Sequence, residues 1–100
     1  MVSVTLKSPG EVRLEIARRV EECRLRKGLS QRELAKRAGI VLATYKMFAR
    51  TGIISLDRLI RVAAALGCLG DFDRIFQPPS FQSLDDVLSA QKPARKRIRK

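Results

Sequence analysis

Two copies of one helix-start motif constrain this chain more than any other feature of its sequence. In residues 8–11 and again in residues 30–33, a serine is followed three positions later by a glutamate. In this capping box, the side chain of each residue accepts a hydrogen bond from the backbone N–H of the other. Gly28 suits the end of the first helix, since glycine readily adopts the left-handed conformation found there. The sequence therefore predicts a helix from about residue 8 to 27 and a second one that begins after Ser30.

Apolar residues follow each of these starts at helical spacing. The buried stripe predicted for the first helix is Val12, Ile16, Val20 and Cys23. In the second helix Leu34 and Ala35 are predicted to point inward, and Gly39 suits a turn with positive φ. A third helix is predicted over about residues 41–50, ended by Thr51 and Gly52.

Further helices are predicted toward the C-terminus. Ser55 is the N-cap of a fourth helix that ends at Gly67. Its predicted buried face is Leu56, Leu59, Ile60, Ala63 and Leu66. A fifth helix of one to two turns is predicted from Phe72, Ile75 and Phe76, and two prolines close it. One more turn is predicted over residues 83–90. Residues 2–6 alternate apolar and polar, and we weigh a short strand and a frayed end equally.

The fold class predicted from these elements is all-α, a five-helix domain with a short N-terminal extension and a basic C-terminal tail. A chain of 100 residues, 45% of them hydrophobic, has room for one core. The predicted divisions are an extension at 1–7, the domain at 8–76, a short helix and linker at 77–91, and the tail at 92–100.

Positive charge is concentrated at one end of the chain. The formal net charge is +11, from 21 basic and 10 acidic residues. Six of the basic residues lie in the last nine positions, so residues 1–91 carry a net charge of only +5. Such an excess of positive charge indicates an anionic partner, most often nucleic acid. The tail is predicted to be disordered when free.

Several functional classes are disfavoured by composition. There is no histidine, the commonest general base and metal ligand, and no recognisable catalytic constellation. Cys23 and Cys68 are too isolated for a zinc site or a disulfide framework. No apolar run approaches the roughly 20 residues that span a bilayer, and residues 1–10 do not form a secretory signal. We therefore expect a cytoplasmic protein with reduced thiols that is not an enzyme and binds no metal or cofactor.

The second and third predicted helices have the spacing of a helix-turn-helix, with small Ala35 and Gly39 where the two backbones approach. Residues 29–40, followed by Thr44, Phe48 and Gly52, resemble the Xre, or phage-repressor-type, helix-turn-helix family, whose fold is lambda-repressor-like. The likeness covers about residues 14–76. A narrower similarity, to HipB-like antitoxin regulators, rests on residues 8–11, 72–76 and 83–85 and on the basic tail.

The resemblance implies a homodimeric transcriptional repressor that binds double-stranded DNA at a palindromic operator. It implies that Gln31 touches a DNA phosphate and that Thr44 lies near the DNA backbone. Base-facing or groove-facing positions are Leu42, Ala43, Lys46 and Met47. Arg32 and Arg50 either contact phosphates or belong to an ordinary solvated face. The candidate nonspecific phosphate contacts in the tail are Arg95, Lys96, Arg97, Arg99 and Lys100. The narrower similarity implies a kinase-like toxin as a partner encoded alongside.

The predicted recognition helix departs from the family pattern in ways that leave two functions open. Val41 stands where a Ser or Thr N-cap is usual, which costs about 1 kcal/mol. Leu42 and Met47 replace polar residues, so they either contact thymine methyl groups or form a protein-binding surface. The alternative function is therefore a protein-interaction module that has weak or lost sequence-specific DNA binding. Tyr45 either fills the core or reaches a phosphate with its hydroxyl.

Overall fold

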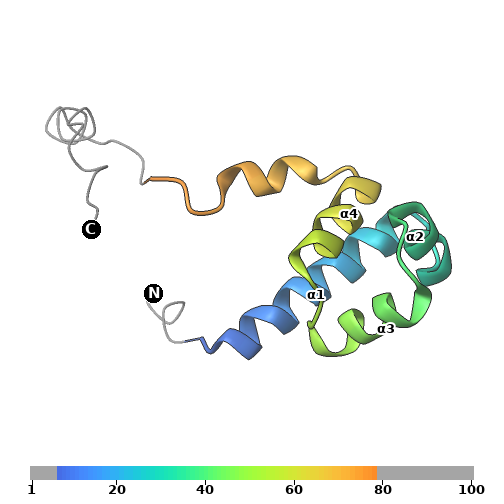
Figure 1. The fold of residues 1–100 in the computed structure, drawn as a ribbon, viewed down its shortest axis with the longest axis horizontal. Coiled ribbons are helices and arrows are strands. Elements are labelled where there is room, and N and C mark those ends of the chain that lie inside the picture. Colours follow the sequence, from blue (N-terminus) through green and yellow to red (C-terminus); the bar gives the residue numbers. More distant parts are fainter. Residues whose placement is uncertain (1–6, 79–100) are drawn as a thin grey trace, which may run out of the picture.

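The computed structural model describes residues 7–78, and every element in that range is helical (Figure 1). The elements are α1 Pro9–Arg26, α2 Gln31–Ala38, α3 Leu42–Thr51, α4 Leu56–Leu66 and the 3-10 helix η2 Leu69–Arg74. The predicted all-α class with five helices is thus confirmed. The pattern at residues 2–6, the turn predicted over 83–90 and the basic tail lie outside the described residues.

Both predicted capping boxes are present. Ser8 Oγ accepts a hydrogen bond from the Glu11 backbone N–H at 3.1 Å, and Glu11 Oε1 accepts one from the Ser8 N–H at 2.8 Å. The same reciprocal pair joins Ser30 and Glu33, at 3.0 and 2.8 Å. These bonds satisfy backbone donors that the first turn of a helix leaves without a partner, so they set where α1 and α2 begin.

The core lies where α2 packs against α4 and α3 packs against α1. Its largest fully buried side chains are Tyr45, Phe48, Leu34 and Val62. Ala35 is also buried, as predicted for the place where helix backbones approach. Figure 1 shows α1 as the longest helix, with α2 near its C-terminal end, α3 running back beside it, and η2 extending away from the others.

The connections after α2, α3 and α4 each use a glycine with positive φ. Gly39, at φ 73°, confirms the predicted left-handed turn between α2 and α3. Gly52, at φ 80°, ends α3 against the backbone of α1, where an added Cβ would lie 2.7 Å from the Arg13 carbonyl carbon. No side chain fits at that distance, so α3 can approach α1 this closely only with glycine at position 52.

Two residues predicted to be buried are exposed. Val12 is 40% exposed, and Ala17 is the fully buried residue of α1. Leu56 is 63% exposed because the buried face of α4 is rotated toward Val62, which lies outside the predicted face. The remaining members of the two predicted stripes are buried or partly buried.

The fifth helix differs from its prediction in position and type. It is a 3-10 helix that ends at Arg74, before Ile75 and Phe76. Phe76 has a φ of 59° and is 99% exposed, so its ring does not cover the core. Because Ile75 and Phe76 follow the end of this helix, helical spacing does not place all three predicted residues on one buried face, and only Phe72 of the three is partly buried.

Candidate nucleic-acid interface

One face of α3 points away from the rest of the molecule. Its exposed residues are Ala43, Lys46, Met47 and Arg50, which follow the i, i+3, i+4, i+7 spacing of a single helix face. The opposite face carries the buried Tyr45 and Phe48. Packing against α1 and α2 therefore presents a narrow strip of two cationic and two apolar side chains.

The two other α3 residues selected from the sequence lie at the edges of this strip. Leu42 is partly buried and packs against the core cluster, so much of its side chain is turned away from the exposed face. Thr44 is also partly buried. The base-facing role implied for Leu42 stays a prediction, but the exposed surface of α3 is centred on the other four residues.

The strip has a positive electrostatic character. α3 contains no acidic residue, and Arg50 lies in its last turn. Val41 is the N-cap and makes no side-chain capping hydrogen bond, as predicted. The first backbone N–H groups of α3 therefore keep their partial positive charge directed outward, which favours a nearby anion.

The start of α2 presents two of the selected residues. Arg32 is exposed, whereas Gln31 is partly buried. The Gln31 side chain donates a hydrogen bond from Nε2 to Oε1 of Glu21, 3.4 Å away on α1. An amide group has a second N–H and a carbonyl oxygen, so this contact orients Gln31 without using all of its capacity.

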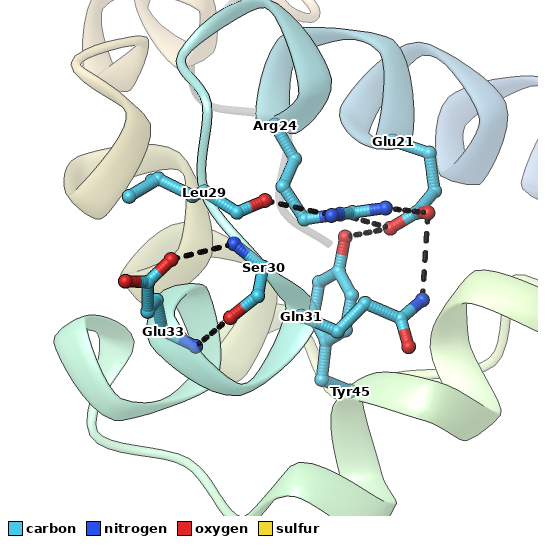
Figure 2. Close-up of polar contacts among 7 residues, drawn as sticks. All are labelled: Glu21, Arg24, Leu29, Ser30, Gln31, Glu33 and Tyr45. Atoms are coloured by element: carbon cyan, nitrogen blue, oxygen red, sulfur yellow. Dashed lines mark hydrogen bonds and ion pairs between the residues drawn. The ribbon is translucent and has the colours of Figure 1, made fainter.

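Glu21 is the centre of a polar cluster that connects three helices (Figure 2). Arg24 donates two parallel hydrogen bonds to its carboxylate, from Nε to Oε2 at 3.0 Å and from Nη2 to Oε1 at 2.8 Å. The hydroxyl of the buried Tyr45 also donates to Glu21 Oε2. Arg24 Nη1 donates to the Leu29 carbonyl oxygen at 2.7 Å, which ties the α1–α2 loop to the same group.

The charges of this cluster stabilise each other. The hydrogen bonds from Arg24 hold the pKa of Glu21 below its ordinary value, against the opposing effect of partial burial. The same contact raises the pKa of Arg24. Burial raises the pKa of Tyr45, and its hydrogen bond to Glu21 raises it further. The cluster therefore consists of an ionised Glu21, a cationic Arg24 and a neutral tyrosine near neutral pH.

Residues 20–71 match the sequence model of the helix-turn-helix family. The chain belongs to this family. Searches of curated proteins and of solved structures found no match. Membership indicates a DNA-binding transcriptional regulator of the Xre type, and it makes α2 and α3 the helix pair for which the family is named. The resemblance inferred from residues 29–40 is confirmed at this level.

By its place in the helix-turn-helix, α3 corresponds to the predicted recognition helix, and the residues predicted to contact DNA fall into two groups by exposure. Exposed side chains belong to Arg32, Ala43, Lys46, Met47 and Arg50; partly buried ones belong to Gln31, Leu42 and Thr44. The tail candidates lie outside the described residues. Contact with DNA stays a prediction for each of them.

Tyr45 fills the core, which is one of its two predicted roles, and its hydroxyl donates to Glu21 instead of reaching outward to a phosphate. The helix-turn-helix also depends on two residues that were not predicted from the sequence. Glu21 and Arg24 were not selected, because a Glu three residues before an Arg is a common pair on helix surfaces. The only available signal was a tyrosine at a recognition-helix position that is usually Ile or Leu.

No helix in the described part of the chain combines the length and apolar character needed to cross a membrane. Within residues 7–78, no group of three His, Cys, Asp or Glu side chains gathers where it could hold a metal ion.

Proposed function

We propose that the protein is a sequence-specific repressor that binds a palindromic operator as a homodimer. The observation that carries this proposal is the exposed face of α3, formed by Ala43, Lys46, Met47 and Arg50. It combines cations that suit phosphates with small and apolar groups that fit a groove, on the helix that this family uses for recognition.

In the proposed complex, two recognition helices enter successive major grooves about 34 Å apart. Lys46, Arg50 and Arg32 contact phosphates, and Gln31 donates to a phosphate at the start of α2. Met47 and Ala43 contact thymine methyl groups, because neither can form the paired hydrogen bonds that discriminate a guanine or an adenine. Occupancy of the operator then blocks polymerase sterically.

An open apolar surface formed by α1, α4 and η2 supports the homodimer. A groove of about 260 Å³ runs between α1, α4 and η2, with Val20, Leu59 and Phe72 among its walls. Ile75 also lines this groove, and the exposed Phe76 follows it. Exposed apolar surface of this kind is typical of interfaces, and a second copy of the chain is the occupant that a palindromic operator requires.

We further propose that this repressor is the antitoxin of a toxin–antitoxin pair in the cytoplasm, with a kinase-like toxin as its partner. The support is the likeness of residues 8–11 and 72–76 to HipB-like regulators. The neighbouring open reading frame tests this finer proposal, since a kinase-like toxin is expected there.

A gel-shift assay with the DNA upstream of the protein's own gene tests the repressor function. Wild-type protein should shift this duplex at lower concentration than a scrambled one. Lys46→Ala and Arg50→Ala should each weaken binding and lower the dependence of affinity on salt, because each removes a phosphate contact. Arg18→Ala is the matched control, since it removes an equal charge from an exposed site on α1.

The alternative is a protein-interaction module that retains the helix-turn-helix fold. The exposed apolar side chains of Val41 and Met47 favour it, because such groups also occur in protein interfaces. Absence of any shift at low salt, with a partner protein co-purifying, overturns the repressor proposal in favour of this one.

A further inference from the structure

We propose that Glu21 is a positioning residue for DNA binding, whose carboxylate holds the start of α2 and the recognition helix α3 in one fixed arrangement. This inference rests on the proposed DNA-binding function and assigns a role to a residue on α1. Glu21 itself contacts no DNA in this arrangement, and it acts through Gln31 and Tyr45.

The first step concerns α3. Tyr45 lies near the start of this helix, one residue before Lys46, and its ring is fully buried. Its hydroxyl donates to Glu21, so both ends of the side chain are held: the ring by the core and the hydroxyl by α1 (Figure 2). This bond limits rotation of α3 about its axis, and such rotation is what would redirect the exposed strip.

The second step concerns α2. Gln31 is its first residue, and Glu21 Oε1 accepts a hydrogen bond from the Gln31 amide. The amide is thereby oriented before any DNA arrives, which lowers the entropy lost when it binds a phosphate. The same carboxylate therefore orients a side chain at the start of α2 and the helix that enters the groove.

The third step concerns charge. A carboxylate near DNA phosphates would repel them, but Arg24 neutralises it through the two hydrogen bonds described above. The side chains of Arg24 and Glu21 are only 12% and 22% exposed, so solvent screens the pair less than it screens a fully exposed pair. Glu21 can therefore organise the DNA-binding surface without weakening its attraction for DNA.

The test compares Glu21→Gln with Glu22→Gln, which makes the same charge change at the exposed neighbouring position. Binding to the upstream duplex is measured at a temperature where circular dichroism shows each protein fully folded. Glu21→Gln should bind about five- to tenfold more weakly than Glu22→Gln, the effect of losing one or two oriented hydrogen bonds. Equal affinities for the two variants overturn the positioning role.

A double-mutant cycle provides a readout that general destabilisation does not move. If Glu21 acts through Gln31, Gln31→Ala should reduce DNA affinity less in the Glu21→Gln protein than in the wild type. Additive effects overturn this coupling. Tyr45→Phe serves if Glu21→Gln does not fold, and it should weaken DNA binding while the protein stays folded; unchanged affinity overturns the role. Failure of the wild-type protein to bind any duplex is a different result, and it overturns the proposed function itself.

Discussion

The hydroxyl of Tyr45 donates a hydrogen bond to the carboxylate of Glu21, across 24 positions of sequence. This contact joins α3 to α1. Arg24 and Gln31 donate hydrogen bonds to the same carboxylate. It also fits the presence of an aromatic residue at a position that is usually aliphatic, since tyrosine provides both an apolar body and a hydrogen-bond donor at its tip.

Removal of this hydroxyl should destabilise the fold without disrupting its packing. Tyr45→Phe retains the ring and is expected to lower the free energy of unfolding by about 1–2 kcal/mol. This is the low end of the range for a hydrogen bond to a charged group, because the Glu21 carboxylate is partly exposed to solvent. Urea denaturation followed by circular dichroism measures the change. Glu22→Gln is the control and should have little effect; a Tyr45→Phe protein as stable as wild type contradicts the prediction.

Alkaline pH should destabilise the protein through the same tyrosine. The folded state raises the pKa of Tyr45 above its ordinary value of 10.0. The contribution of the neutral Tyr45 hydroxyl to the free energy of unfolding is therefore complete below pH 10, and it is lost as the pH rises toward the pKa of the folded state. Tyr45 is the only tyrosine and there is no tryptophan, so tyrosinate absorbance reports on this residue alone. Ionisation should appear only together with unfolding. Ionisation near pH 10 in folded protein would contradict this, and Tyr45→Phe corrects for other titrating groups.

The close approach of α3 to α1 should make position 52 intolerant of any side chain. Gly52→Ala combines positive φ with a Cβ 2.6 Å from the Arg13 Cβ, and we expect a loss of about 3 kcal/mol of stability. Gly28→Ala is the matched control, because Gly28 has a φ of 72° and open space around its Cβ position. It should lose only about 1 kcal/mol, the cost of positive φ. If thermal or urea denaturation shows the same loss of stability for both variants, the backbone of α1 moves away to admit the new side chain at position 52, which contradicts the prediction.

The missing N-cap of α3 offers a route to higher stability. Val41→Ser should provide a side-chain oxygen for a first-turn backbone N–H and raise the unfolding free energy by about 1 kcal/mol. Val41→Ala, which removes the same bulk without adding an acceptor, is the control and should not stabilise. A serine variant no more stable than the alanine variant would indicate that the first-turn donors are already satisfied.

The basic tail should supply affinity without selecting a site. Deletion of residues 92–100 is expected to reduce the salt dependence of DNA binding and to leave the preferred sequence unchanged, because six fewer cations displace fewer counterions. Titrations at several salt concentrations, on specific and random duplexes, measure both quantities. An unchanged salt dependence would mean that the tail does not contact DNA.

Local signals predicted the boundaries of the first four helices well. The two capping boxes, the uncapped Val41 and the turn at Gly39 each depend on a few adjacent residues, so the sequence contains the information needed to infer them. The family resemblance implied groove-facing positions for Lys46 and Met47, and both side chains are exposed on α3.

The incorrect predictions concern which face of a helix is buried and whether the apolar residues after α4 pack against the core. Leu56 and Val62 both suit a buried face of α4, and only packing against α2 selects Val62. Phe76 is apolar by composition, yet the backbone turns it away from the core.

By itself, the sequence determined the first four helices, their ends and the helix-turn-helix spacing, because these depend on hydrogen bonds and backbone conformations within a few residues. Only the tertiary structure decided that Glu21 joins Gln31, Arg24 and Tyr45, since those side chains lie on three different helices. Burial of the Tyr45 ring directs its hydroxyl to α1, and long-range packing of this kind has no signature in the order of the residues.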